Sequence, residues 1–134
     1  MRDPQAVISQ VRQGAAPAGW RVFTKKRGAI GAFFRGTSDD PDPMLVFTMD
    51  AAIEYVSGKK PLDAVYFADL ASVVLRADAR TTSDSLAAHL RVWLDLQYLD
   101  GRKAKWNSAT FPNDLPVIQQ FLEAHALCKA LSQR

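Results

Sequence analysis

Alternating apolar and polar residues identify β-strands in the middle of the chain. The clearest example is residues 90–98. Its apolar positions are separated by single, mostly polar ones: Leu90, Val92, Leu94, Leu96 and Tyr98. Successive side chains of a strand point to opposite faces, so this segment is predicted to bury one face and leave the other in water. Trp93 falls on the face that is predicted to be exposed.

An Asp-Gly pair at residues 100–101 marks the turn after this strand. A two-residue loop would place Asn107 opposite Leu94 and so put a polar residue on the apolar face. A three-residue loop, residues 99–101, places Trp106 there instead. Because a shift of one residue inverts every side chain, we predict the three-residue loop, with its glycine in the left-handed conformation and Trp106 facing the core.

Further short stretches rich in valine and aromatic residues are predicted to be strands: residues 20–25, 29–34, 44–49, 52–57, 64–67 and 71–76. Turn signals separate them, among them the Gly-Lys-Lys-Pro sequence at 58–61. Two polar segments are predicted to be loops: the acidic, proline-broken residues 37–43 and the small, polar residues 77–86, which we expect to be mobile.

A helix is predicted at each end of the strand region. Asp3 and Pro4 are typical of a helix start, and an apolar stripe at Val7, Ile8 and Val11 continues to Gly14.

A longer helix is predicted over residues 114–131, with Pro116 in its first turn. Its apolar face carries Ile118, Phe121, Leu122, His125 and Cys128. We therefore predict one α+β domain over residues 1–134, with a short N-terminal helix (1–14), antiparallel strands (20–109) and a C-terminal capping helix (114–131).

Composition is typical of a globular protein. The chain has 134 residues, 48% of them hydrophobic and 23% charged, which is enough for one domain with a sizeable core. A single cysteine excludes an internal disulfide and favours a reducing, cytoplasmic environment. The first residues lack the apolar core of a signal peptide, and no apolar run reaches the roughly 18–20 residues needed to cross a bilayer.

The net charge of +3 conceals an uneven distribution. Residues 1–36 carry seven basic and one acidic side chain, whereas residues 37–100 carry five basic and eleven acidic ones. Either oppositely charged segments lie beside one another, or the basic residues form a face for an anionic partner. The candidate anion-binding residues are Lys25, Lys26, Arg27, Arg35, Lys59 and Lys60. The alternative interpretation is that these residues are solvated tips of hairpins. No long basic run indicates nucleic acid.

No catalytic, metal-binding or cofactor-binding set is identified. His125 and Cys128 lie three residues apart on the predicted helix, but two ligands do not make a zinc site. The acidic residues of the 37–43 loop lack the ligand spacing of a known calcium site. No nucleophile–base pair is recognisable, and the glycines match no phosphate-binding loop.

Three segments carry a resemblance to a known family. They are Leu-Val-Phe-Thr-Met-Asp at 45–50, Ile-Glu-Tyr-Val at 53–56 and Val-Tyr-Phe-Ala-Asp-Leu-Ala-Ser-Val-Val-Leu at 65–75. Followed by an Asp-Gly hairpin and a C-terminal helix, this pattern resembles bacterial pleckstrin-homology and GRAM-type domains. The resemblance implies a barrel of two near-orthogonal antiparallel sheets capped by the helix. It also implies a non-enzymatic protein that binds phosphoinositides, peptides or partner domains. The basic residues at 25–27 and 35 do not have the spacing of the family's phosphoinositide motif.

These observations predict a non-catalytic interaction module. Its expected partner is a protein or peptide, or a second copy of itself, recognised through an exposed sheet edge or through the face that carries Trp93. The alternative is recognition of an anionic lipid, phosphate or membrane surface by the basic first hairpin. A small enzyme is the least favoured reading.

Overall fold

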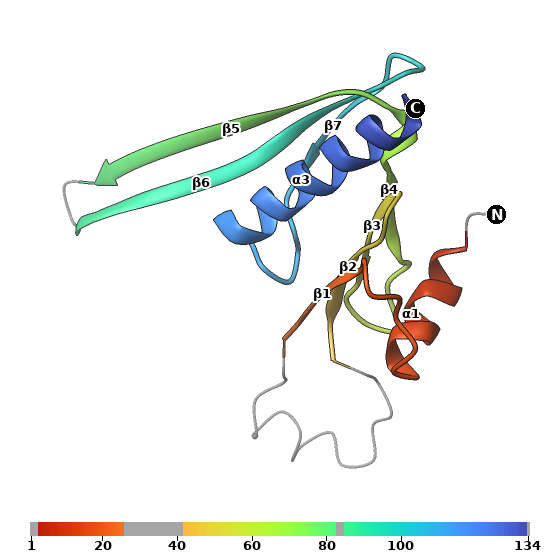
Figure 1. Ribbon diagram of the computed structural model, residues 1–134. Coiled ribbons are helices and arrows are strands. Elements are labelled where there is room, and N and C mark those ends of the chain that lie inside the picture. Colours follow the sequence, from red (N-terminus) through yellow and green to blue (C-terminus); the bar gives the residue numbers. More distant parts are fainter. Residues whose placement is uncertain (1–2, 26–41, 83–84, 134) are drawn as a thin grey trace, which may run out of the picture.

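Two antiparallel sheets and a long C-terminal helix form the part of the chain that the computed structural model describes, residues 3–25, 42–82 and 85–133 (Figure 1). The first sheet contains, in order, β1 (Arg21–Thr24), β2 (Met44–Phe47), β3 (Ala51–Tyr55) and β4 (Asp63–Tyr66). A 3-10 turn, η1 (Phe67–Asp69), leads to the second sheet of β5 (Leu70–Thr82), β6 (Ser85–Tyr98) and β7 (Lys103–Trp106). The helices are α1 (Pro4–Arg12) and α3 (Leu115–Ser132).

The predicted α+β class and the two antiparallel sheets are confirmed. No pairing joins the two sheets among the described strands, so the expected barrel closure is not seen there. The strand predicted at 29–34, the basic turn at 26–28 and residues 37–41 of the acidic loop lie outside the described residues. No helix within the described ranges is long and apolar enough to span a membrane.

Helix α1 begins where the sequence predicts. The Asp3 side chain accepts a hydrogen bond from the Ala6 amide at 3.2 Å, and Gly14 has the positive φ (73°) that favours glycine after a helix. Ile8 is buried against one face of the first sheet, in a cluster with Met44, Val46, Ala51, Ile53 and Tyr55. This explains why β2 and β3 are buried at every residue: α1 covers one face and the main core covers the other.

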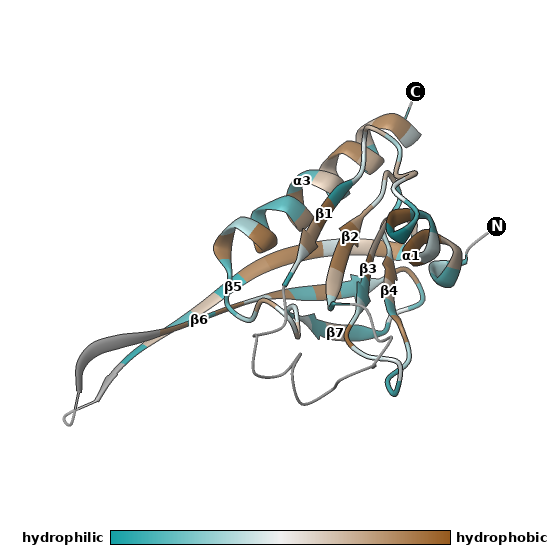
Figure 2. Ribbon diagram, turned by 90° about the horizontal axis from the view of Figure 1, so that it is seen from below, coloured by the Kyte–Doolittle hydropathy of each residue, from teal (hydrophilic) through white to brown (hydrophobic). Residues whose placement is uncertain are grey.

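Helix α3 closes the main core. Asp114 caps it by accepting from the Val117 amide at 3.2 Å, and Pro116 lies in its first turn. Phe121 is completely buried, with its ring centroid 4.7 Å from that of Trp106 and 5.3 Å from that of Phe67. In Figure 2 the apolar, brown stretches of β2 and of the near part of β5 run beside this helix. The prediction of a capping helix with Phe121 at its centre is confirmed.

The predicted hairpin register between β6 and β7 is also confirmed. Leu94 pairs with Trp106 and Leu96 with Ala104 across a three-residue loop. Gly101 has φ 94°, and Trp106 is buried. Lys105 remains on the solvent side.

The predicted loop over residues 77–86 is wrong. β5 continues to Thr82 and β6 begins at Ser85, so the two strands form a long two-stranded arm that extends beyond the rest of the molecule (Figure 1). Ala77, Asp78 and Ala79 concealed the strand because alanine and aspartate are depleted in strands. The antiparallel partner supplies the backbone hydrogen bonds that propensity does not reveal.

Candidate functional site

The outer face of the second sheet is the candidate site. Along β6 the core-facing residues Val92, Leu94 and Leu96 are buried, and the alternate residues point away from the core. Trp93 is among these outward residues, as predicted. It is half-buried rather than fully exposed, because neighbouring side chains pack around it.

Trp93 is held by charged neighbours from β6 and β7. Its Nε1 donates a hydrogen bond to Oδ1 of Asp95 at 3.1 Å. The Arg91 guanidinium carbon lies 6.0 Å from the ring centroid, and the Lys105 Nζ lies 5.2 Å from it. Cations within about 6 Å of an aromatic ring are attracted to its face. The other oxygen of Asp95 accepts from Nε of Arg76 at 3.0 Å, so one carboxylate orients both the tryptophan and an arginine.

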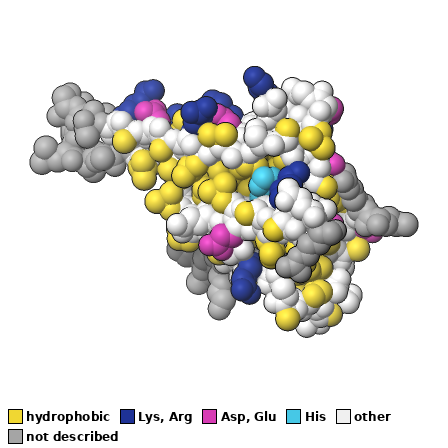
Figure 3. Space-filling model, turned by 45° about the horizontal axis from the view of Figure 1, so that its top comes forward, with side chains coloured by type: hydrophobic (Ala, Val, Ile, Leu, Met, Phe, Trp, Pro, Cys, Tyr) yellow, Lys and Arg dark blue, Asp and Glu magenta, His cyan; other side chains and the backbone are white. Residues whose placement is uncertain are grey.

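Positive charge predominates on this face. The strand registers place on it the basic residues Arg76, Arg80, Arg91, Lys103 and Lys105. The acidic residues on the same face are Asp78 and Asp95. Figure 3 shows dark-blue and magenta side chains along the arm. Ion pairs between these exposed side chains, such as Arg76 with Asp95 and Arg80 with Asp78, add little to stability. The excess of cations therefore acts mainly by attracting anionic groups.

A shallow hollow of about 390 Å³ adjoins Trp93 on this face. It extends over all three strands, and its lining includes Ser72, Val74, Arg76, Gln97, Lys103 and Lys105. Val74 is 41% exposed and supplies an apolar contact among the polar groups. The hollow is large enough for a few side chains of a partner, and its rim is cationic.

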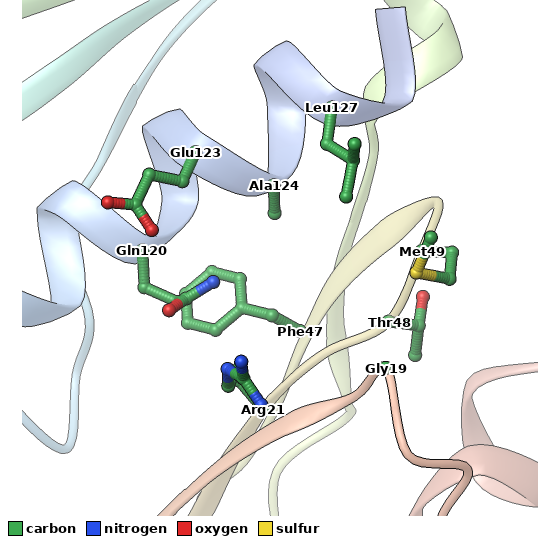
Figure 4. A pocket seen from close by; sticks show the side chains of 9 residues that line it. All are labelled: Gly19, Arg21, Phe47, Thr48, Met49, Gln120, Glu123, Ala124 and Leu127. Atoms are coloured by element: carbon green, nitrogen blue, oxygen red, sulfur yellow. The ribbon is translucent and has the colours of Figure 1, made fainter. Parts of the chain in front are cut away.

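A second pocket lies between the first sheet and α3 (Figure 4). The buried Phe47 forms part of its wall, with Arg21 on the β1 side and Gln120 and Glu123 on the helix side. Its volume of about 180 Å³ is below the roughly 300–1,000 Å³ that is usual for small-molecule sites. It is therefore a weaker candidate than the outer face.

The structure brings together part of the predicted basic cluster. Thr24 pairs with Met44, and Met44 pairs with Tyr55, so the end of β1 and the end of β3 lie at the same end of the first sheet. Lys25 follows Thr24, and the turn with Lys59 and Lys60 follows β3, all three exposed. Lys26, Arg27 and Arg35 lie outside the described residues.

His125 and Cys128 are both partly buried on α3. The His125 ring packs against Phe67 at 6.0 Å, and Cys128 packs against the main core. Burial disfavours the imidazolium and lowers the pKa of His125 below its usual 6.5, and the nearby Lys129 charge adds to this effect. No group of three metal-ligating side chains occurs within the described residues.

Sequence reasoning missed Glu54. This buried carboxylate accepts hydrogen bonds from Ser108 Oγ (2.5 Å), the Ala109 amide (3.0 Å) and the Thr110 amide (3.3 Å). It thereby fastens the loop between β7 and α3 to the first sheet. Burial, with a further contribution from the Glu54 charge, raises the pKa of the neighbouring Asp63. The available signal was a glutamate in the apolar stretch of β3, at a position whose alternation directs it toward the core.

No family model, curated protein or solved structure matches this chain.

Proposed function

We propose that this chain is a non-catalytic interaction module that binds an acidic, extended segment of a protein partner on the outer face of β5–β7. The observation that carries the proposal is Trp93, half-buried between Arg91 and Lys105 on a face with more cations than anions. Tryptophan and arginine are the residues that most often dominate the energy of protein interfaces.

The chemistry of the face favours binding over catalysis. Its only carboxylate beside Trp93 within the described residues, Asp95, is already engaged by Trp93 and Arg76. The remaining groups of the hollow offer cations, an amide, a hydroxyl and a small apolar surface. These groups suit acidic side chains interspersed with apolar ones.

A pleckstrin-homology-like architecture is part of the proposal. Two antiparallel sheets with a C-terminal helix over the core are what that resemblance implies, and the family is a family of binding modules. The single cysteine, which is not in a disulfide, accords with action in the cytoplasm.

Recognition of an anionic ligand by the basic end of the first sheet is the second candidate function. It is supported by the register that brings Lys25 to the same end as Lys59 and Lys60. The ligand would be a phosphate group or an anionic lipid headgroup, since ammonium groups attract both.

Selection from a display library of twelve-residue peptides tests the leading proposal. We expect enrichment of peptides that carry Asp and Glu beside apolar residues. Their affinity should fall as salt rises and should fall at least tenfold in a variant with Arg91→Glu and Lys105→Glu. Lys59→Glu with Lys60→Glu is the matched control, because it makes the same charge change elsewhere. Selected peptides that bind the outer-face variant as well as the original protein would refute the proposal.

A further inference from the structure

The outer edge of β5 pairs with no other strand of the described residues. β5 bonds only to β6 within the described sheets, whereas the other side of β6 is occupied. There β7 pairs with the segment from Leu94 to Gln97, and the Val92 amide donates to Oδ1 of Asn113 at 3.0 Å. β5 contains neither proline nor glycine over its 13 residues. A long edge strand with free N–H and C=O groups is a template for a further strand.

An exposed apolar strip borders this edge. Leu75, Ala77 and Ala79 lie on the core-side face of β5, where Leu75 pairs with Leu94 and Ala79 with Leu90. Along the arm the main core no longer packs on this face. Leu75 and Leu90 are 46% and 47% exposed there. Figure 3 shows a continuous yellow area beside the charged row of the arm. An added strand would place its own side chains beside this strip and bury the flanks of its edge residues.

The charged residues on the outer face of β5 indicate that the added strand is β5 of a second copy of the chain. In an antiparallel pair of two identical strands, a two-fold axis at Ala77 places Arg76 opposite Asp78 of the second copy, and Asp78 opposite Arg76. Axes at Arg76 or at Asp78 place like charges opposite one another, which destabilises a strand pair. An axis at Ala79 pairs Asp78 with Arg80 of the second copy, but it sets Ala77 of the apolar row opposite the polar Thr81. The axis at Ala77 also sets Leu75 opposite Ala79 of the second copy, so apolar side chains meet across the strand pair in the same register.

We infer that two copies of this chain associate through β5, antiparallel and centred on Ala77. The two three-stranded sheets then form one continuous sheet, and the free edge of each arm is removed. The axis is perpendicular to the sheet, so both outer faces with Trp93 lie on the same side. The inference does not depend on what those faces bind.

Disulfide trapping tests the register. In a Cys128→Ser background, two copies of Ala77→Cys face each other with Cα atoms about 4.5–5.5 Å apart, within the range of a disulfide. Ala79→Cys is the matched control. Its two copies are displaced by four residues along the strands, roughly 13 Å. On mild oxidation we expect covalent dimers from Ala77→Cys and few from Ala79→Cys. Equal trapping of the two variants, or trapping of neither, overturns the inference.

Sedimentation of charge variants tests the Arg76–Asp78 pairing. The unmodified chain should show a monomer–dimer equilibrium, and Asp78→Arg should weaken it about tenfold, because like charges then face each other. Adding Arg76→Asp to that variant restores opposite charges across the axis, so it should recover most of the affinity. A chain that stays monomeric at high concentration, even if it binds acidic peptides, refutes self-association and leaves the proposed function standing. Dimerisation unaffected by Asp78→Arg refutes the register.

Discussion

Ser108 donates a hydrogen bond of 2.5 Å to Glu54, a buried carboxylate 54 residues away in the chain. Two backbone amides, those of Ala109 and Thr110, donate to the same carboxylate. The first sheet is therefore joined to the loop before α3 by one acidic side chain, whose burial is tolerated because it is hydrogen-bonded at several points.

Removing this carboxylate should destabilise the protein strongly. In Glu54→Ala the three donors lose their acceptor and a cavity remains, so we expect a loss of about 3 kcal/mol or more in the free energy of unfolding. Urea titration followed by circular dichroism measures it. Glu123→Ala, which removes an exposed carboxylate of α3, should cost about 0.5 kcal/mol or less. Equal stabilities of the two variants would show that Glu54 does not hold the loop.

Phe121 should be a principal contributor to the core. Its ring has no exposed surface and packs against Phe47, Phe67 and Trp106. Phe121→Ala should lower the free energy of unfolding by about 3–5 kcal/mol. Leu127→Ala on the exposed side of the same helix is the control. A melting temperature within a degree or two of the unmodified protein would contradict the role of α3 as a cap.

His125 should make stability depend on pH. Its pKa in the folded protein lies below the usual 6.5, so the unfolded chain binds more protons than the folded one as the pH falls through this region. The contribution of His125 to stability is therefore full above pH 6.5 and declines as the pH falls below it. His125→Asn should show a shallower fall in the free energy of unfolding between pH 7.5 and about pH 5. Identical pH profiles would contradict the buried-imidazole assignment.

Anionic vesicles test the basic end of the first sheet. If it binds anions, the protein should sediment with vesicles containing phosphatidylserine at low salt, with about 1 kcal/mol from each cation near the surface. Reversing Lys25, Lys59 and Lys60 to glutamate should abolish this binding without changing the circular dichroism spectrum. Arg91→Glu with Lys105→Glu, on the other sheet, measures any contribution of the cationic outer face to the same binding. Failure of the unmodified protein to bind even at low salt removes the anion-binding proposal.

Local patterns were sufficient for several elements. The alternation in β6 and the glycine at 101 predicted that Trp106 faces the core, and the structure confirms it. Asp3 with Pro4 located the start of α1, and Pro116 in the first turn located that of α3; in the structure Asp3 and Asp114 cap the two helices. These features are predictable because they depend on residues within a few positions of one another, through strand alternation, turn conformation and the unpaired amides of a helix start.

The candidate site was predicted in part. Alternation placed Trp93 on the face away from the core, but Lys105 reaches its ring from β7 and Arg76 is opposite it on β5. The alternation of one strand contains no information about which residues of other strands lie beside it. The positive character of this face is therefore visible only after all three strands are aligned.

The sequence by itself determined the class of the fold, the β6–β7 register and the residues on the inner side of α3, since each follows from periodicity or a turn within one segment. Only the tertiary structure decided the length of the β5–β6 arm, the role of Glu54 and the surroundings of Trp93. The arm is a strand because its residues of low strand propensity have a partner strand, and Glu54 is buried because donors from a distant loop meet it. Hydrogen bonds and charges between distant segments outweigh local propensity, and no local pattern records them.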